Sequence, residues 1–155
     1  MNAVTKYIRR AKFENLTNPT TGLPSGKLIE EQLKTIKNQE NWTLLYIGVY
    51  DMEPFKEIQG IVALDDVLLF IATVLKESIE KHGTLNDFIG HAGSNDFIIV
   101  TQPDVASVIC HEVTNRFNKE VQVFYPFRVR QEGKVITIDS RGNKLESPFM
   151  TLSVG

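Results

Sequence analysis

Residues 87–100 carry the pattern that most restricts the fold of this chain, because a short polar turn separates two apolar runs there. Gly93, Ser94 and Asn95 are residue types that tolerate the dihedral angles of a hairpin turn, and the β-branched and aromatic residues on either side suit paired strands. The pattern predicts a β-hairpin with the carboxylate of Asp96 at its tip. An antiparallel pair of strands is therefore expected in the second half of the chain.

The remaining helices and strands are predicted from the spacing of apolar residues. Helices are expected over residues 1–16, 25–37, 62–82 and 104–117. Further strands are expected over residues 42–50, 127–138 and 149–154, with a turn at 139–143. Ser25 and Asp104 are placed to cap two of the helices, and the nearly continuous apolar run at 42–50 is typical of a central strand buried on both faces. The order of elements predicts an α+β fold, with helices packed on a mostly antiparallel sheet.

Composition narrows the class of protein. A chain of 155 residues suits one domain with a core of its own. The net charge of -2 provides no basic field to hold a polyanion, so nucleic-acid binding is disfavoured. Cys110 is the only cysteine, which excludes an internal disulfide, and no apolar run approaches the roughly 20 residues that cross a bilayer. Because the N-terminus also lacks the apolar core of a signal peptide, the segment is expected to be cytoplasmic, with no part in a membrane.

The hairpin also resembles the signature hairpin of the GGDEF family, the diguanylate cyclases that join two GTP molecules into cyclic dimeric GMP. The family's turn reads Gly-Gly-Asp/Glu-Glu/Asp-Phe, and residues 93–97 of this chain read Gly-Ser-Asn-Asp-Phe. Residues 21–24 match the family's opening Leu-Thr-Gly-Leu-Pro, and residues 44–59 match its strand followed by Asp-x-Asp-x-Phe-Lys-x-Ile-Asn. Residues 149–155 match its later strand ending in Thr-x-Ser-x-Gly. Ordered blocks at matching spacing are far more specific than any one of them.

The resemblance implies a fold and domain limits. The fold is the nucleotidyl-cyclase or palm-like sandwich, a ferredoxin-like arrangement with helices packed on a mostly antiparallel central sheet. Residues 18–155 are expected to form the GGDEF-like domain, preceded by a lead-in helix at 1–17, and residues 130–147 resemble a longer hairpin that some members carry. The family continues with a helix whose Lys and Arg clamp phosphates. A domain truncated at Gly155, without the family's C-terminal helix and strand, is therefore expected.

The family's reaction is phosphoryl transfer, which implies a metal site. A ribose 3′-hydroxyl of one GTP attacks the α-phosphate of another, and Mg²⁺ held by hard oxygen ligands neutralises the triphosphate. The matching metal-binding positions are Asp51, the backbone carbonyl of Met52, and Asn95. Asn95 stands where the family has an acidic residue, so weak Mg²⁺ binding and no intact catalytic base are expected there. Asp96 follows it, but successive residues of a strand point to opposite faces.

The resemblance also implies a nucleotide-binding set, which departs from the family at several positions. Its members would be Phe55, Lys56, Gln59, Asp65, Gly93 and Ser94. Ser94 replaces a glycine where the family brings the backbone close to the nucleotide, and Gln59 stands for an Asn of the guanine-recognition segment. Asp65 could accept hydrogen bonds from the guanine N1 and N2 donors. Thr84 stands where many members have the Arg of an inhibitory product site, so that Arg is missing.

Simpler interpretations are open for these residues. Asp51 could be a solvated carboxylate at a strand end, and Asp65 could favour the first turn of a helix through its charge alone. Asn95 and Asp96 could be turn residues and nothing more. His91 fits a strand histidine with a satisfied hydrogen bond better than a metal ligand.

The sequence leaves three functional hypotheses. The first is a degenerate GGDEF domain of a bacterial cyclic-di-GMP-type signalling protein, catalytically inactive and acting as a regulatory, nucleotide-binding or dimerisation module. The second is a diguanylate cyclase with weak residual activity, using Asp51, Asp96 and a bridging water. The third is a structural domain that binds no nucleotide. The expected partners are GTP or another guanine nucleotide, other signalling domains of the same protein, and a second copy of the chain.

Overall fold

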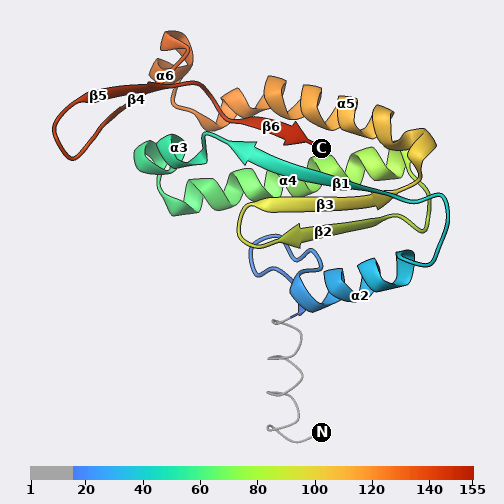
Figure 1. Cartoon of the computed structure of the whole chain (residues 1–155). Coiled ribbons are helices and arrows are strands. Elements are labelled where there is room, and N and C mark those ends of the chain that lie inside the picture. The colour runs from blue at the N-terminus through green and yellow to red at the C-terminus, as the bar shows by residue number, and fades with distance from the viewer. Residues whose placement is uncertain (1–15) are drawn as a thin grey trace, which may run out of the picture.

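The computed structural model describes residues 16–155 as an antiparallel sheet between layers of helices (Figure 1). The strands are β1 (Thr43–Tyr50), β2 (Phe88–Ala92), β3 (Asp96–Thr101), β4 (Val135–Ile138), β5 (Lys144–Ser147) and β6 (Thr151–Val154). The helices are α2 (Gly26–Ile36), α3 (Met52–Gln59), α4 (Ile61–His82), α5 (Pro103–Glu120) and α6 (Phe127–Glu132), with a short 3-10 helix, η1 (Val121–Phe124). The lead-in helix predicted for residues 1–17 lies outside the described residues, apart from Leu16 and Thr17. Within residues 16–155, no helix is long and apolar enough to cross a bilayer.

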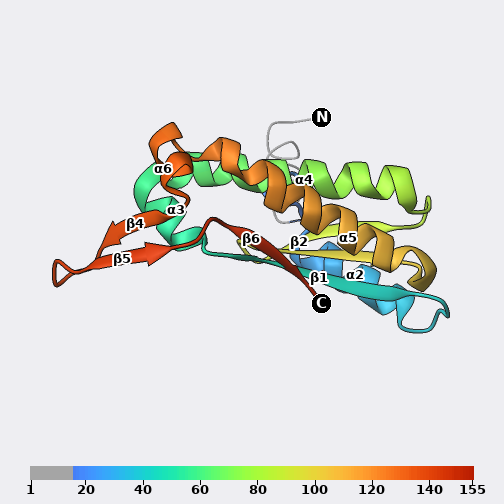
Figure 2. The same cartoon turned by 90° about the horizontal axis from the view of Figure 1, so that it is seen from above.

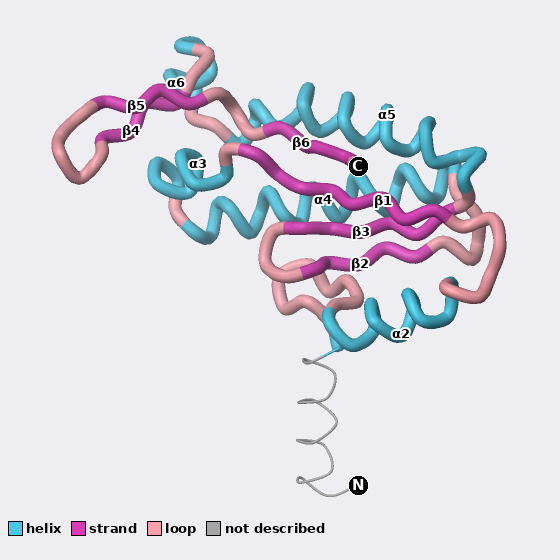
Figure 3. The backbone as a smooth tube through the Cα atoms, in the orientation of Figure 1, coloured by secondary structure: helices cyan, strands magenta, loops and turns pink. Residues whose placement is uncertain are grey.

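The main sheet has the strand order β2–β3–β1–β6, and each neighbouring pair is antiparallel. α4 and α5 lie on one face of this sheet, and α2 lies on the opposite side, against β2 (Figures 1 and 2). β4 and β5 form a separate hairpin that projects from the body near α3 and α6 (Figure 3). The predicted α+β architecture is confirmed, and the projecting hairpin lies within residues 130–147, where a longer hairpin was expected.

The core lies between the sheet and the layer formed by α4 and α5. Fully buried aromatic and aliphatic side chains fill it, including Phe55 of α3, Ile71 of α4, Phe97 of β3 and Phe117 of α5. Full burial of such a side chain stabilises the fold by about 1.5–3 kcal/mol. The same core therefore holds the start of α3 and the hairpin strand β3, the two segments on which the candidate site depends.

β1 is the central strand that the sequence predicts, because it lies between β3 and β6. The prediction that β1 is buried on both faces is wrong. Leu45 and Ile47 are buried, whereas Leu44 and Tyr46 on the other face are 43% and 48% exposed. The physical reason is that α2 covers the outer face beside β2 and leaves the outward side chains of β1 exposed.

β2 and β3 form the predicted hairpin, with His91 opposite Phe97 and Ala92 opposite Asp96. Gly93 turns the chain with a φ of 60°, which a glycine adopts without the steric cost of a Cβ atom. Asp96 is the first residue of β3 and not the tip of the turn, because it is already paired with Ala92. The tip consists of residues 93–95.

The strand predicted over residues 127–138 is wrong in its first half. Phe127–Glu132 forms α6, and only Val135–Ile138 forms a strand. Pro126 precedes α6 with a φ of -59°, and Gly133 ends it in the left-handed region with a φ of 72°. These two backbone constraints favour a short helix over the extended chain that the alternation of apolar residues indicated.

Two smaller differences concern helix ends, and a third concerns a helix that was not predicted. α5 begins at Pro103 with Gln102 as its N-cap, so Asp104 lies in the first turn and is not the predicted cap. Ser25 does occupy the N-cap of α2, but its side chain makes no capping hydrogen bond. α3 was not predicted, because its eight residues are too few to show a helical period in the sequence.

Candidate functional site

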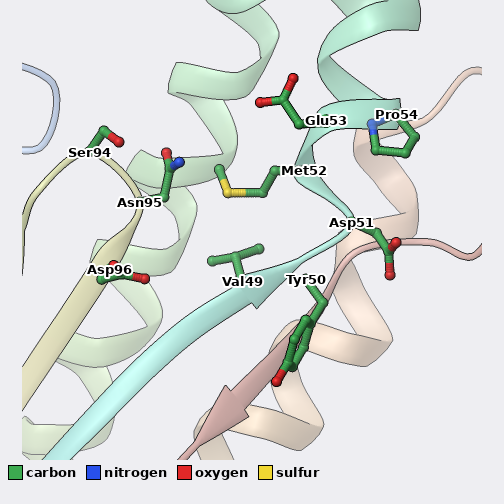
Figure 4. Close-up of a pocket in the computed structure, with 9 residues that line it drawn as sticks. All are labelled: Val49, Tyr50, Asp51, Met52, Glu53, Pro54, Ser94, Asn95 and Asp96. Carbon is green, nitrogen blue, oxygen red and sulfur yellow. The ribbon is translucent and has the colours of Figure 1, made fainter.

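A pocket of about 490 Å³ lies between the hairpin turn and the junction of β1 with α3 (Figure 4). Its lining includes Asp51, Met52, Asn95 and Asp96, together with Ser94. The structure therefore brings together all three predicted metal-binding positions and one residue of the predicted nucleotide-binding set. The fully buried side chains of α3 and β3 fix the two walls of this pocket relative to each other.

Asp51 joins β1 to α3 in a left-handed conformation, with a φ of 64° and a ψ of 35°. Few residues other than glycine adopt this region, where a Cβ atom costs roughly 1–2 kcal/mol. The Asp51 carboxylate points away from the hairpin turn in Figure 4. The Asp51 carboxylate instead interacts electrostatically with the buried Tyr125. The Tyr125 hydroxyl accepts a hydrogen bond of 2.8 Å from the Met150 amide. Burial raises the pKa of Tyr125, and the nearby Asp51 carboxylate raises it further.

The side chains of Asp51 and Asn95 point in different directions, which affects the expected Mg²⁺ site. Asn95 offers a neutral amide, and the Asp51 carboxylate is directed elsewhere. Over residues 16–155, no three His, Cys, Asp or Glu side chains are grouped as ligands for a metal ion. Mg²⁺ requires several well-placed oxygen ligands, and the Asp51 carboxylate does not turn toward Asn95 in this arrangement.

Asp96 points to the outer face of the sheet, beside β1. Its Oδ1 lies 3.8 Å from the position that a Cβ atom on Gly48 would occupy. A hydrogen bond with Asp96, followed by burial and by the charge of Asp96, raises the pKa of the Tyr46 hydroxyl. Asp96 therefore interacts with an outward residue of β1, although it also lines the pocket of the metal-binding positions.

His91 connects the hairpin turn to the loop that precedes α2. Its ring is fully buried and stacks on Phe97 with 4.3 Å between ring centroids. Nε2 lies 2.9 Å from the carbonyl oxygen of Ser94, and Nδ1 lies 2.9 Å from the hydroxyl of Thr21. A carbonyl oxygen only accepts, so Nε2 carries the proton and Nδ1 of the neutral ring accepts from Thr21. The hypothesis of a hydrogen-bonded strand histidine is confirmed.

Five members of the predicted nucleotide-binding set are not part of this pocket's lining. The Phe55 side chain is fully buried against Tyr125, with 5.0 Å between ring centroids. Gln59 donates a hydrogen bond of 3.1 Å from Nε2 to the carbonyl of Phe124, which ties α3 to η1. Lys56 is exposed on α3 and Asp65 is half-buried on α4. Of the six residues in the set, Ser94 alone lines the pocket, while its neighbour Gly93 shapes the turn.

Sequence reasoning missed the residues that surround the pocket on its outer side. Tyr50 and Glu53 line it. Tyr46, which lies on β1 like Tyr50, forms a hydrogen bond with Asp96 of the neighbouring strand β3. The signal was present, because Tyr46, Gly48 and Tyr50 alternate along one strand and must share a face. The assumption of burial on both faces of β1 concealed it.

Among the comparisons with known proteins, only the comparison with solved structures gives matches, and these concern the fold. No family model matches the chain, and no curated protein matches it. The structure is similar to that of the diguanylate cyclase SiaD from Pseudomonas aeruginosa, solved in complex with its activator SiaC, with a TM-score of 0.63 and 19% identity. That match covers 98% of this chain and 53% of the other, so the chain spans about half the length of SiaD.

Two further solved structures agree. The FimX GGDEF domain from Pseudomonas aeruginosa matches with a TM-score of 0.63 and 16% identity, over 90% of this chain and 77% of that one. The coiled coil and GGDEF domain of DgcB from Caulobacter crescentus, in complex with c-di-GMP, matches with a TM-score of 0.61 and 15% identity, over 98% of this chain and 73% of that one. Since the antiparallel sheet, the central hairpin and the helical layers all correspond, this chain has the palm-like fold of a GGDEF domain.

Proposed function

We propose that this chain is a regulatory domain of a cyclic-di-GMP signalling protein, which binds a guanine nucleotide weakly and does not join two of them. The main support for the proposal is that the side chains of Asp51 and Asn95 point in different directions. Both residues line one pocket, yet the carboxylate of Asp51 points away from the turn and the amide of Asn95 has no charge. Such a pair does not present two anionic oxygens to a divalent cation, and phosphoryl transfer from GTP depends on that neutralisation.

The signalling context is an inference from the fold. Solved proteins with this fold include a diguanylate cyclase bound to an activator and a GGDEF domain bound to c-di-GMP. The resemblance of residues 93–97 to the family's turn adds sequence support, although Ser94 and Asn95 depart from it. A domain that keeps the fold and loses one of the two charges at the turn is suited to regulation through binding or pairing.

The first experiment measures the reaction directly. The full chain is incubated with GTP and either Mg²⁺ or Mn²⁺, and cyclic dimeric GMP is sought by chromatography. We expect no product. Product that disappears in Asp51→Ala would overturn the proposal and establish a weak cyclase instead. That second candidate has one observation in its favour, since Asp51, Glu53 and Asp96 all line the pocket.

The second experiment restores the missing charge at the turn. Asn95→Asp adds a carboxylate inside the pocket, so we expect Mn²⁺ to strengthen GTP binding in this variant more than in the unchanged chain. Asn86→Asp is the matched control, because it adds the same charge at an exposed residue outside the pocket lining. Equal effects of the two variants would show that the turn is not a metal-binding position.

The third experiment separates regulation by nucleotide from a purely structural role. Calorimetric titration with GTP should give weak, saturable binding at millimolar concentration. The absence of heat at that concentration would remove the nucleotide from the proposal and favour a scaffold.

A further inference from the structure

A second pocket on the outer face of the sheet adjoins the first. It measures about 340 Å³, and Val49 and Gly155 contribute to its lining. The other lining residues are Tyr46, Gly48 and Tyr50 of β1, Asp96 of β3 and Ser153 of β6, which together we call the tyrosine cradle. The two pockets share Val49, Tyr50 and Asp96. Apart from Asp96, no residue of the cradle belongs to the predicted site.

The backbone of β1 gives the cradle its shape. Tyr46, Gly48 and Tyr50 follow one another at intervals of two along the strand, so all three point outward. At the usual rise of a strand, the Cα atoms of the two tyrosines are about 13 Å apart, with Gly48 midway between them. A Cβ atom on Gly48 would have Asp96 Oδ1 as its nearest neighbour, at 3.8 Å. The floor between the rings is therefore open, with Asp96 on one side and Ser153, paired with Gly48, on the other.

The charge of the cradle is negative. Asp96 lies at its side, and Asp51 and Glu53 line the adjoining pocket. Among the described residues that line the two pockets, there is no lysine or arginine. The face of a tyrosine ring attracts a cation through its quadrupole, and both tyrosines are substantially exposed, Tyr46 by 48% and Tyr50 by 59%. Aromatic walls and an acidic side together favour a cation and oppose a phosphate.

We propose that the tyrosine cradle binds the guanidinium group of an arginine side chain presented by a partner polypeptide. A planar guanidinium can stack on a tyrosine ring and at the same time donate paired hydrogen bonds to a carboxylate. Asp96 supplies that carboxylate, and the Ser153 hydroxyl adds an acceptor on the opposite side of the floor. The proposal does not rest on the proposed function, although a nucleotide in the first pocket would meet two of the same side chains, Tyr50 and Asp96.

The test is a titration of the full chain, followed by ¹H–¹⁵N NMR, with N-acetyl-arginine amide as the probe. We expect saturable shift changes at Gly48, Asp96 and Ser153 at millimolar probe. N-acetyl-citrulline amide, which has nearly the same shape without the charge, should give much smaller changes. Equal responses to the two probes, no saturable response to arginine, or changes centred elsewhere would each overturn the proposal. Preferential binding of guanosine at the same residues would also overturn it, because the cradle would then be a base-stacking site.

Substitutions in the tyrosine cradle show which side chains contribute to the affinity for the arginine probe. Asp96→Asn keeps the size of the side chain and removes its charge, so the affinity for the arginine probe should fall by about tenfold. Tyr50→Leu removes one aromatic wall and should weaken binding by about fivefold. Asp104→Asn is the matched control, since this exposed carboxylate lies beyond the opposite end of β3 and should leave the affinity unchanged. Unchanged affinity in Asp96→Asn, with an unaltered unfolding midpoint, would rule out the carboxylate contact.

Discussion

The Nε2 atom of His91 donates a hydrogen bond of 2.9 Å to the backbone carbonyl of Ser94, and so ties the strand β2 to the hairpin turn that it precedes. The same ring accepts a hydrogen bond from Thr21, which belongs to the loop before α2. Because the ring is buried and both nitrogens are used, the neutral form of His91 holds the turn, α2 and the start of the domain in one arrangement.

The first prediction concerns the pH dependence of stability. Burial lowers the pKa of His91 in the folded chain, against smaller opposing effects from Ser94 and Asp96. The unfolded chain therefore binds more protons near and below pH 6.5, the ordinary value for histidine. The stability that the neutral ring provides should be complete above about pH 6.5 and decline as the pH falls below it. Urea unfolding midpoints at several pH values check this.

The control for this prediction is a pair of substitutions. His91→Gln should lower stability at neutral pH and flatten the decline on acidification. His111→Gln, at an exposed residue of α5, should change neither. A decline of the same size in His91→Gln would assign the pH dependence to other groups.

The second prediction concerns the strained backbone at the site. Asp51 has a φ of 64°, so Asp51→Gly removes a Cβ atom from an unfavourable region and should raise the free energy of unfolding by up to about 1 kcal/mol. Lys37→Gly is the contrasting substitution, because Lys37 has ordinary helical dihedral angles and its replacement should destabilise the chain. Chemical denaturation measures both. A clear loss of stability in Asp51→Gly would show that the Asp51 side chain stabilises the fold by more than its backbone strain costs.

The third prediction concerns the contact between α2 and the sheet. A Cβ atom on Gly90 would lie 2.8 Å from Cγ1 of Ile29 and 3.1 Å from Cγ1 of Ile98. Gly90→Ala should therefore destabilise the chain by about 1–3 kcal/mol through overpacking. Ile29→Ala in the same chain should recover part of this loss, because it removes the closest atoms, and a double-mutant cycle measures the coupling. Additive effects of the two substitutions would contradict this packing account.

The fourth prediction concerns the edge strand β6. Asn118 of α5 accepts a hydrogen bond of 3.1 Å from the Leu152 amide to its Oδ1, on the edge of β6 that faces away from β1. An unpaired edge invites pairing with another chain, so Asn118→Ala should speed amide hydrogen exchange at Leu152 and increase self-association. Asn115→Ala, at an exposed position one turn earlier on α5, is the control. Equal exchange at Leu152 in both variants would show that the Asn118 contact does not protect the edge.

Much of the fold could be predicted because its signals are local. The hairpin followed from turn residues between β-branched runs, and α4 followed from a long helical period, which the structure places at Ile61–His82. Residues 127–138 misled the prediction because a six-residue helix bounded by Pro126 and Gly133 has no room to show its period. α3 was missed for the same reason of length.

The candidate site was predicted only as a set of positions. The resemblance assigned Asp51, Met52 and Asn95 to one metal site, and in the structure the three residues line one pocket. It could not show that the Asp51 carboxylate points away, because that direction depends on a left-handed residue between β1 and α3. Nor could it show that Phe55 is buried in the core, or that Gln59 forms a hydrogen bond between α3 and η1.

The sequence by itself determined the order of the four strands of the main sheet, the hairpin and the resemblance to the GGDEF family, since each depends on residue types at fixed short spacing. The tertiary structure alone decided which face of β1 is open, how the turn is held by His91, and where Asp51 and Asp96 point. The reason is that these features arise from contacts between segments far apart in the chain. Thr21 lies 70 residues from His91, and no local pattern records such a contact.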